Sequence, residues 1–563
     1  MTNHHYPLYE TTVFENFRVM TENVARRYPN RIAFIFRRRP TDPEPVQVTF
    51  REARDRIRAL GTALIAHGLR ETPAALVGDG TYDWICSYFA LMAIGAIVVP
   101  LDKDLPSDQM RAILSQAGCR AILCGKSIQA KIEELRSQPG MSVPCVVMDS
   151  PDFDALVAEG QERLALGDSA YDDDEIDADR LATIVFTSGT TGSGKGVMLS
   201  QKNIVSDMTN GMSLFAITPK SISILPPHHT FGSTVNFVGH FSQGATLYLS
   251  SGLRTIAAEI KEQQPTHLVL VPLFLEKLHN RIWSAAEAKG QARLLRCLIR
   301  LSNALRRIGI DLRRKLFRSV LEQLGGRLEM VICGGAALKQ EVIETFDGIG
   351  ITVLNGYGIT ECSPLVSCNR NKFQKKGSVG VPILLETVKI LNPDENGEGE
   401  ICVKGPNVML GYYNDPEATE QAFDADGFFR TGDLGKLDDE GWLYLTGRLK
   451  NLIILSNGKN VSPEEIEAEL AGIPGIAEVV VYAGESRFNR QKEVIVAEIF
   501  PDSAWLTEHA VADAQAYFDE AVRQVNSRMV AYKAVSLVKL RQEEFTKNTS
   551  RKIQRFCIDK RVD

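Results

Sequence analysis

The segment "TSGTTGSGKGV", residues 187–197, directly follows the apolar run "LATIVF" at residues 181–186. Gly189, four further residues and a Gly-Lys pair reproduce most of the Walker A spacing, which also requires a Ser or Thr after the Lys to hold Mg²⁺. That next residue is Gly196. A strand that ends in glycines and hydroxyl side chains still points several backbone N–H groups one way, and Lys195 adds a positive charge. The segment therefore favours a polyphosphate-binding loop of another design over an ordinary glycine-rich turn.

Apolar strand-like runs alternate with helical patterns on the N-terminal side of this loop and beyond it. "IRALGTALIAHGL" (57–69) precedes "TPAALVGDG" (72–80), and "MRAILSQAG" (110–118) precedes "CRAILCG" (119–125). Strands that alternate with helices of this length are typical of parallel sheets covered on both faces. The predicted fold class is therefore α/β. At 563 residues the chain is expected to form two to four domains.

The bulk composition excludes several function classes. Lys and Arg number 64 against 70 Asp and Glu, so the net charge of −6 provides no global field for nucleic acid. Ten Cys without a CxxC pair fit reduced thiols in a cytoplasmic protein. No secretory signal is expected at the N-terminus. The longest apolar stretch, residues 88–101, is shorter than the roughly 20 residues of a membrane span and predicts a buried helix end, a break at Gly95 and a buried strand.

Composition also suggests the domain boundaries. The run "YDDDEIDAD" (171–179) has the charge of a solvated linker. From about Asn396 the segments shorten and turn signals appear, which predicts a β-rich subdomain. After Gly447 comes "SPEEIEAEL" (462–470), a Ser-capped helix with acidic residues in its first turn. We therefore predict a large N-terminal domain, residues 1–447, and a small α+β C-terminal domain, residues 448–563.

Several motifs in fixed order resemble the adenylate-forming superfamily of acyl-CoA synthetases, nonribosomal adenylation domains and luciferases. They are the loop at 187–197, "NGYGITEC" (355–362), "FFRTGDLG" (428–435), "GRLKNLI" (447–453) and "NTSRKIQR" (548–555). The resemblance implies a large domain and a small domain that rotates about a hinge. It also implies two half-reactions: a carboxylate and ATP give acyl-AMP and pyrophosphate, and a thiol then captures the acyl group.

The resemblance assigns nucleotide-binding roles residue by residue. The loop residues that would hold the β- and γ-phosphates are Thr187, Ser188, Gly189, Thr190, Thr191, Gly192 and Lys195. The residues that would surround the rest of the nucleotide are Asn355, Gly356 and Tyr357 at the adenine, Thr360 at the α-phosphate, and Asp433 and Arg448 at the ribose. Glu361 would bind Mg²⁺, a role that suits a carboxylate beside phosphates, although Glu361 taken alone would be read as a surface residue.

The C-terminal motifs would act in the two half-reactions. Lys552 matches the lysine that bridges the acyl carboxylate and the α-phosphate, where a cation offsets the repulsion between two anions. Without the other motifs it would be read as a solvated tail cation. Lys450 falls on the hinge position. Gly458, in the hairpin "LSNGKNVSP" (455–463), would line the thiol tunnel.

Other positions would form the acyl site. His229 in "LPPHHTFG" (225–232) matches the residue at the carboxylate end of the acyl pocket, whereas the plainer interpretation is a buried core histidine. Gly334, Gly335 and Ala336 match one pocket wall. Two positions depart from the family: Gly194 replaces a usual Pro, and Arg551 precedes Lys552 where many members have Gly. Neither change removes a charged functional group, so we expect activity.

The substrate is predicted from further sequence features. No Asp follows His229 at the position that pairs with an amino-acid ammonium group, which disfavours amino acids. Residues 274–335 resemble the insertion of medium- and long-chain fatty acyl-CoA synthetases. Leucines recur there at near-helical spacing, and arginines crowd the segment 293–318. This segment is predicted either to pack on the core with a solvated basic face or to attach the protein peripherally to the inner, anionic face of a membrane.

The predicted function is a fatty acid–CoA ligase with ATP, Mg²⁺ and CoA as cofactor and co-substrates. The alternative is an acyl-AMP ligase that loads the phosphopantetheine thiol of an acyl carrier protein. A Walker-type NTPase is disfavoured by Gly196. A non-catalytic acyl-adenylate binder is disfavoured because Lys195, Glu361, Asp433 and Lys552 occur together.

Overall fold

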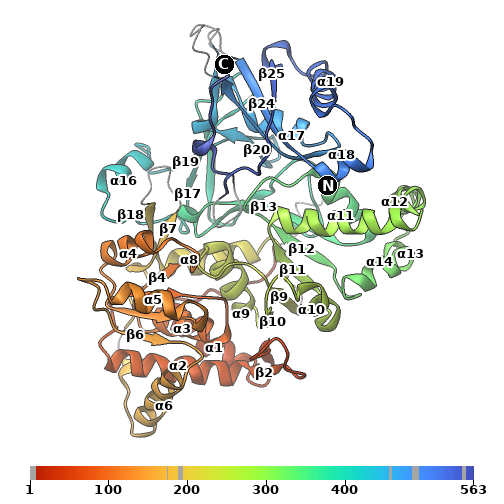
Figure 1. Ribbon diagram of the computed structural model, residues 1–563. Coiled ribbons are helices and arrows are strands. Elements are labelled where there is room, and N and C mark those ends of the chain that lie inside the picture. The colour runs from red at the N-terminus through yellow and green to blue at the C-terminus, as the bar shows by residue number, and fades with distance from the viewer. Residues whose placement is uncertain are drawn as a thin grey trace. The chain divides into compact units, whose positions relative to one another are not determined.

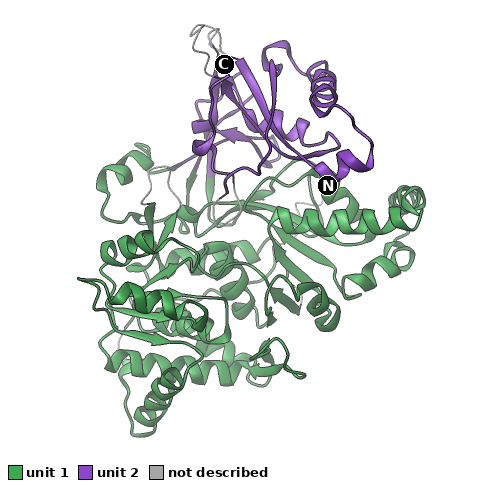
Figure 2. Cartoon of the chain, in the orientation of Figure 1, with its two compact units in different colours: residues 1–387, 403–429 green, residues 388–402, 430–563 purple. Residues whose placement is uncertain are grey.

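The computed structural model describes residues 8–173, 175–187, 194–217, 219–455, 460–484, 494–547 and 553–562. The chain forms two compact units (Figure 2). Unit 1 comprises residues 1–387 and 403–429, and unit 2 comprises residues 388–402 and 430–563. Unit 2 thus includes part of the β-rich stretch that was predicted to belong to the large domain. The predicted division of the chain into domains 1–447 and 448–563, with a hinge near Lys450, stays a prediction.

The first part of unit 1 is a seven-stranded sheet (Figure 1). Its strands, in sheet order, are β18 (Gly411–Tyr412), β8 (Lys195–Ser200), β7 (Leu181–Thr187), β4 (Ile97–Leu101), β3 (Pro73–Val77), β5 (Ala121–Cys124) and β6 (Cys145–Val147). The strands from β7 to β6 run parallel, whereas β8 is antiparallel to β7 and β18 is antiparallel to β8. The expected parallel α/β architecture is confirmed.

Helices cover both faces of this sheet. The helices of this region are α1 (Phe17–Arg27), α2 (Phe50–Ala66), α3 (Tyr82–Ala93), α4 (Ser107–Gln116), α5 (Gln129–Arg136), α6 (Pro151–Ala165), α7 (Ala170–Asp173) and α8 (Gln201–Met212). Met110 of α4 and Ile132 of α5 share a core with Ala75 and Ile122, whose side chains point to one face because residues alternate along a strand. Helix α3 contacts β3 and β4 and is buried on nearly all sides, as its apolar sequence requires.

The apolar stretch at residues 88–101 has the predicted structure. Helix α3 ends at Ala93, Gly95 adopts a left-handed φ of 74°, and β4 begins at Ile97. The acidic stretch at residues 171–179 differs from the prediction of a plain linker. Its Tyr171 lies in α7 and is buried, and a Cβ built on Gly61 would lie 2.7 Å from the Tyr171 ring. An aromatic side chain therefore anchors the start of this acidic run in the core.

Two further sheets complete unit 1. The four-stranded sheet has the order β2 (Val46–Thr49), β1 (Ile32–Phe36), β10 (Thr246–Leu249) and β9 (Lys220–Ser223), and the five-stranded sheet has the order β11 (His267–Leu270), β12 (Met330–Cys333), β13 (Thr352–Gly358), β14 (Leu365–Cys368) and β15 (Val381–Pro382). Thr266 exchanges hydrogen bonds with Lys220 and so joins the start of β11 to the start of β9.

The remaining helices of unit 1 lie mostly around these two sheets, whereas α16 packs beside β18 (Figure 1). They are the π-helical segment η3 (Phe231–Val238), α9 (Gly239–Ser242), α10 (Ile256–Gln263), α11 (Pro272–Ala288), α12 (Ala292–Arg307), α13 (Arg313–Leu316), α14 (Arg318–Gln323), α15 (Gln340–Ile349), the 3-10 turn η4 (Thr360–Cys362) and α16 (Pro416–Ala422). Leu295 of α12, Leu321 of α14 and Phe346 of α15 share one apolar core with β11 and β12.

Unit 2 is α+β, as predicted for the C-terminal residues. Its strands are β16 (Thr387–Leu391), β17 (Gly399–Lys404), β19 (Phe429–Leu437) and β20 (Leu443–Arg448) in one sheet, β21 (Ile453–Ile454) with β22 (Asn460–Val461), and β23 (Ile476–Gly484), β24 (Val494–Pro501) and β25 (Leu537–Leu540) in a third. Its helices are α17 (Pro463–Leu470), α18 (Ser503–Glu508) and α19 (Ala514–Asn526), with 3-10 turns η5 (Leu449–Asn451) and η7 (Arg555–Cys557). Ser462 occupies the predicted N-cap of α17, but its hydroxyl donates to Thr446 O at 2.7 Å instead of accepting a helix N–H.

Candidate active site

The flanks of the glycine-rich loop form an antiparallel hairpin. Thr187 ends β7, Lys195 begins β8, and the two residues face each other across the ladder. The Thr187 hydroxyl donates to Lys195 O at 3.3 Å. Five of the predicted phosphate-binding residues lie outside the described residues: Ser188, Gly189, Thr190, Thr191 and Gly192.

The structure explains why Gly follows the lysine. Gly196 lies inside β8, whereas a Walker A lysine is followed by a helix. A Cβ at this position would lie 3.0 Å from Ile184 Cγ2 and 3.2 Å from Tyr413 Cβ. The position therefore has little room for the hydroxyl side chain that a Walker A loop requires, which argues further against the NTPase alternative.

Lys195 and Glu361 approach the same tyrosine, which the sequence analysis did not identify. The Lys195 ammonium lies over the Tyr412 ring, 4.4 Å from its centroid. The Tyr412 hydroxyl donates to Glu361 Oε1 at 2.9 Å. Burial, followed by the negative charge of Glu361, raises the pKa of Tyr412 well above its ordinary value, so the phenol remains a donor. A predicted phosphate ligand and a predicted metal ligand thus lie on either side of one side chain.

The turn that carries Thr360 and Glu361 is fixed by its neighbours. Met409 N donates to Glu361 O at 2.8 Å. The buried Asn407 amide donates to Cys362 O at 3.0 Å and to Leu365 O at 2.9 Å. The segment 405–413, which reads "GPNVMLGYY", therefore supports the turn. In the sequence, this segment is marked by the pair Gly411-Tyr412, which follows the apolar residues 408–410.

The predicted adenine residues lie beside the predicted acyl-pocket wall. Asn355, Gly356 and Tyr357 lie in the second half of β13, while Gly334 follows the end of the neighbouring strand β12. A Cβ on Gly334 would lie 3.4 Å from Gly356 O and 3.6 Å from Phe231 Cζ. The two groups therefore meet at the carboxyl edge of the sheet, where open α/β sheets bind ligands.

The rest of this wall adds two backbone features. Gly335 adopts a left-handed φ of 88°, which favours glycine, and Ala336 follows it in the turn after β12. Phe231 approaches the wall from the segment after His229 and is a second residue that the sequence analysis did not single out.

His229 is half-buried and lies next to a second histidine. The His228 and His229 rings have centroids 4.2 Å apart, and the His229 carbonyl accepts from Ser233 N at 2.8 Å. His228 Nε2 lies 3.5 Å from the Asp102 carboxylate, which follows the end of β4. Burial lowers the pKa of His228, and the nearby Asp102 opposes this shift. Both histidines are half-buried, so neither is a fully buried core histidine.

The two predicted ribose residues meet in unit 2. Asp433 of β19 faces Arg448 of β20 across an antiparallel ladder, and Arg448 Nε lies 2.7 Å from Asp433 Oδ1. The Asp433 side chain is buried, with 7% exposed, whereas 57% of the Arg448 side chain is exposed. A buried carboxylate and an exposed guanidinium fork are suited to recognise vicinal hydroxyls.

The predicted hinge and the residues that follow it also lie in unit 2. Lys450 lies in the exposed turn η5 directly after β20. A Cβ on Gly447 would lie 2.2 Å from Ser462 Oγ, so β20 and the start of α17 approach closely. Gly458, Arg551 and Lys552 lie outside the described residues.

The flanks of the Lys552 segment are anchored. Lys547 forms ion pairs with Glu478 and with Glu544, and it pairs with Ile553 in a β-bridge. Arg555 Nη2 lies 2.6 Å from Glu467 Oε1, and its Nη1 donates to Val481 O at 3.0 Å. Both ends of the segment are therefore held by charged contacts.

The described residues fit a Mg²⁺ that is shared with phosphates. Among them no group of three or more His, Cys, Asp or Glu side chains could enclose a metal ion. Glu361 offers one carboxylate, and Thr360 precedes it in the same turn, η4. Mg²⁺ keeps several waters and needs only one or two protein carboxylates when substrate phosphates complete its shell.

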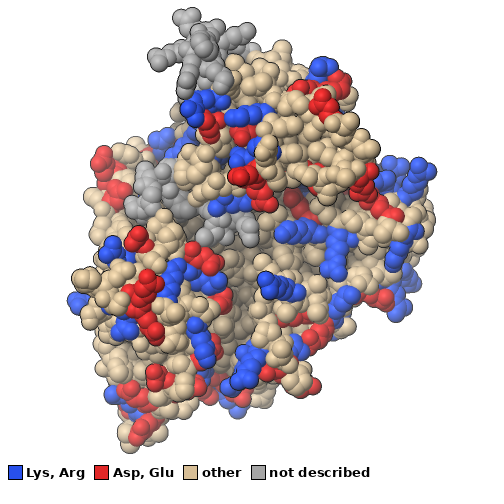
Figure 3. Space-filling model, viewed as in Figure 1, with Lys and Arg blue, Asp and Glu red and all other residues tan. Residues whose placement is uncertain are grey.

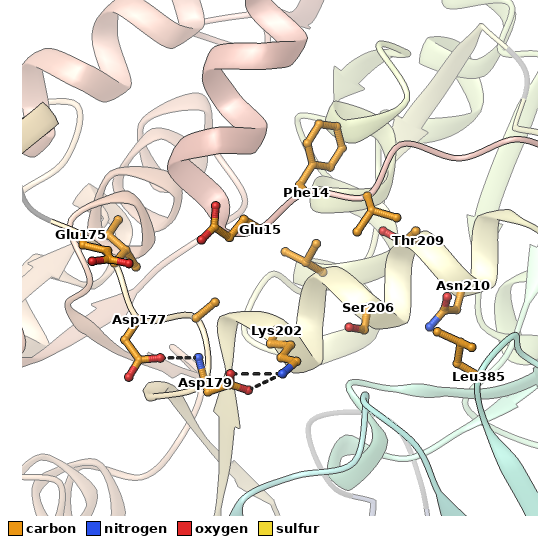
Figure 4. A pocket seen from close by; sticks show the side chains of 14 residues that line it. Phe14, Glu15, Glu175, Asp177, Asp179, Lys202, Ser206, Thr209, Asn210 and Leu385 are labelled. Carbon is orange, nitrogen blue, oxygen red and sulfur yellow. Dashed lines mark hydrogen bonds and ion pairs between the residues drawn. The ribbon is translucent and has the colours of Figure 1, made fainter.

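A cavity of about 680 Å³ lies elsewhere in unit 1, between α8 and residues 175–179 (Figure 4). Its rim carries the acidic side chains of Glu15, Glu175 and Asp177, and Lys202 is paired with Asp179 at 2.8 Å. No described candidate residue lines it. An acidic rim repels a polyphosphate, so this cavity does not compete with the candidate site.

Comparisons with known proteins identify the family of the chain. Residues 21–413 match the family described as AMP-binding enzyme. The chain is 27% identical to the long-chain fatty acid–CoA ligase FadD15 of Mycobacterium bovis, over 95% of each chain, and 30% identical to long-chain fatty acid–CoA ligase 1 of Cavia porcellus, over 84% of this chain and 72% of that protein. The fold resembles ATP-bound MatB from Rhodopseudomonas palustris with a TM-score of 0.74 and 23% identity, over 95% of this chain and 96% of that chain. The chain belongs to the family of AMP-binding enzymes.

Proposed function

We propose that the protein is an ATP-dependent, AMP-forming fatty acid–CoA ligase of the cytoplasm. The observation that carries the proposal is the contact of Lys195 and Glu361 with one tyrosine, because it provides a cation for phosphates and a carboxylate for Mg²⁺ side by side. Relatives named long-chain fatty acid–CoA ligases, similar over most of the chain, support a medium- or long-chain acid as the substrate.

The residues act in two steps. In the first, a carboxylate oxygen of the fatty acid attacks the α-phosphorus of ATP, and pyrophosphate leaves with the electrons of the broken P–O bond. Lys195 and residues 187–192 hold the leaving phosphates, Thr360 contacts the α-phosphate, and Lys552 offsets the charge of the two anions. Asn355, Gly356 and Tyr357 bind the adenine, and Asp433 and Arg448 bind the ribose. Mg²⁺ at Glu361 would neutralise phosphate charge.

In the second step, the thiol of CoA attacks the acyl carbon of the mixed anhydride and AMP leaves. His229, Gly334, Gly335 and Ala336 border the acyl group, and Gly458 lines the path of the thiol. We assign residues 1–447 and 448–563 to two bodies that change orientation at Lys450 between the steps.

Hydroxamate trapping tests the first step directly. The protein would be incubated with ATP, Mg²⁺ and a series of acids from acetate to palmitate, with and without CoA. We expect acyl-hydroxamate with medium- or long-chain acids, and acyl-CoA and AMP when CoA is added. Absence of product with every acid would contradict the proposal.

The second candidate acceptor is the phosphopantetheine thiol of an acyl carrier protein. The same first step serves either thiol, so the acceptor is separated by adding each thiol to preformed acyl-AMP. A thioester with holo carrier protein but not with CoA would favour an acyl-AMP ligase of the carrier-protein type.

We also propose that α12 attaches the protein to an anionic membrane. No helix among the described residues is long and apolar enough to span a bilayer. Leu294 and Leu301 of α12 and Ile308, which directly follows this helix, are spaced seven residues apart. These residues are 55%, 51% and 71% exposed, respectively. Figure 3 shows Lys and Arg side chains gathered over the region of α11 to α14.

Two groups among the arginines of the segment 293–318 differ in their contacts. Arg306 and Arg313 form ion pairs with Asp347, and Arg314 donates to Leu328 O, so these side chains hold the fold together. Within the described part of the chain, the group Arg293, Arg300 and Arg307 forms no ion pair, and these residues share the seven-residue spacing of the exposed apolar side chains. An apolar stripe beside unpaired cations suits an anionic lipid surface.

Vesicle co-sedimentation tests this surface. We expect the protein to bind vesicles of anionic phosphatidylglycerol but not of neutral phosphatidylcholine, and we expect salt to weaken the binding. Replacing Arg293, Arg300 and Arg307 with Gln should abolish it. Arg318→Gln is the matched control because Arg318 is paired with Glu322 at 2.9 Å. Equal binding by the triple variant would contradict the membrane proposal and leave the ligase proposal unaffected.

A further inference from the structure

Tyr412 lies where two parts of the candidate site are joined through the backbone. It belongs to β18, which pairs with β8 so that Tyr412 faces Val197, two residues beyond Lys195. On the other side, Met409 N donates to Glu361 O at 2.8 Å. Tyr413 N donates to Gly196 O at 2.7 Å. The main chain on both sides of Tyr412 is therefore fixed to the loop and to the turn.

The Tyr412 side chain makes two different contacts with two charged groups. Its ring face lies under the Lys195 ammonium at 4.4 Å, and its hydroxyl donates to Glu361 Oε1 at 2.9 Å. A tyrosine is suited to both contacts because the ring face is negative and the O–H is a donor. No ion pair joins Lys195 to Glu361 within the described residues.

The separation of these charges has a chemical consequence. A direct ion pair between Lys195 and Glu361 would engage a donor and a carboxylate oxygen with each other, in competition with phosphate and Mg²⁺. With the tyrosine between them, the ammonium keeps its donors for phosphate oxygens. The hydroxyl occupies one carboxylate oxygen of Glu361 and leaves Oε2 for a metal ion, in agreement with the few carboxylate contacts that Mg²⁺ prefers.

We infer that Tyr412 is a positioning residue that keeps Lys195 available for the nucleotide phosphates and orients Glu361 for Mg²⁺. The inference rests on the proposed function for the identity of the nucleotide. It assigns separate tasks to the two parts of one side chain: the ring supports the lysine, and the hydroxyl orients the carboxylate. The two tasks are separable by substitution.

The test compares Tyr412→Phe with Tyr412→Leu by measuring ATP binding calorimetrically over a range of Mg²⁺ concentrations. Tyr412→Phe keeps the ring and loses the hydroxyl. We expect this variant to need on the order of tenfold more Mg²⁺ than the wild type for half-maximal tightening of ATP binding, because it loses one hydrogen bond to a charged group. At saturating Mg²⁺, its affinity for ATP should equal that of the wild type. Tyr412→Leu should weaken ATP binding even at saturating Mg²⁺, because Lys195 loses its support.

Tyr413→Phe is the matched control, because it removes the hydroxyl of the neighbouring tyrosine and should leave the Mg²⁺ dependence unchanged. Thermal unfolding identifies variants that fail to fold. A wild-type Mg²⁺ dependence in Tyr412→Phe, or an equal loss at every Mg²⁺ concentration, would overturn the inference. ATP binding is measured separately from acyl-CoA formation. A protein that binds ATP with Mg²⁺ but forms no acyl-CoA would therefore contradict the proposed function, while the binding data would still test the role of Tyr412.

Discussion

The two glycines that flank Lys195 perform different tasks. Gly196 sits in a strand whose neighbours leave little space for a side chain, whereas Gly194 adopts a left-handed φ of 51°. Proline, which usually stands at position 194 in the resembling family, is restricted to a φ near −65° and is incompatible with this backbone. The chain thus has glycine in place of the family's usual proline at a position whose backbone conformation proline cannot adopt.

Gly194→Pro should lower the kcat/KM for ATP at least tenfold, because the chain entering Lys195 must change conformation. Gly194→Ala should have a smaller effect, since a left-handed alanine costs about 1 kcal/mol. The measurement is the initial rate of pyrophosphate release. Gly167→Ala is the control, since Gly167 also has a positive φ of 88° but lies away from the site. Normal ATP kinetics in Gly194→Pro would show that the left-handed conformation is not needed.

A buried histidine pair predicts acid sensitivity. His240 Nε2 lies 2.7 Å from His267 Nε2, and both rings are almost fully buried. Burial lowers the pKa of His240 to about 4 and that of His267 well below its ordinary value. The unfolded chain therefore binds more protons than the folded chain below pH 6.5, so acid favours unfolding.

We expect the free energy of unfolding to fall between pH 6.5 and pH 4, by on the order of 3 kcal/mol from His240 alone. Urea denaturation at a series of pH values measures this. His240→Gln should be less stable at pH 7.5 but should show a shallower decline towards pH 4. The exposed His67, paired with Glu159, gives the control His67→Gln. An unchanged pH slope in His240→Gln would contradict the assignment.

At the scale of elements, the C-terminal segment depends on one arginine. Arg555 binds the half-buried Glu467 of α17, whose pKa is raised to about 7 by burial and held down by the Arg555 charge. Arg555→Ala should destabilise unit 2 by about 2 kcal/mol, because it leaves a buried carboxyl without its cation. It should also slow acyl-AMP formation severalfold, because Lys552 lies only three residues before the lost anchor.

Thermal unfolding and hydroxamate formation measure the two effects. Arg555→Lys should recover part of both, since a lysine restores the charge but not the planar fork. Arg561→Ala is the control, because the exposed Arg561 side chain pairs with the neighbouring Asp559 on the surface. A stable Arg555→Ala variant with a normal adenylation rate would show that the anchor does not act on the reaction.

At the scale of the whole molecule, the two half-reactions should respond differently to one substitution. Lys552→Ala should slow acyl-AMP formation by orders of magnitude and leave thioester formation from supplied acyl-AMP largely intact, because the proposed role of Lys552 is confined to the attack at the α-phosphorus. Single-turnover assays of each step measure this. Equal loss in both steps would contradict a change of orientation about Lys450.

Much of the fold and part of the candidate site follow from local patterns. The alternation of strands and helices predicted the parallel sheets, and the run at residues 88–101 predicted α3, the turn at Gly95 and β4, because hydrophobic period and glycine are local signals. The placement of Asp433 opposite Arg448 could be expected only after the hairpin register was known. The prediction that the Ser462 side chain caps α17 was wrong, because the Ser462 hydroxyl donates to Thr446 O in a tertiary contact.

The sequence by itself determined the α/β class, the family resemblance and most candidate residues, since these depend on residue type, spacing and order along the chain. Only the tertiary structure revealed the contacts of Asn407 and Tyr412 around Glu361 and the crowding at Gly196. These features depend on side chains that are far apart in the sequence and meet through β18, β8 and η4. A contact across folded elements leaves no periodic trace in the chain, so its chemistry becomes visible only when the elements are packed together.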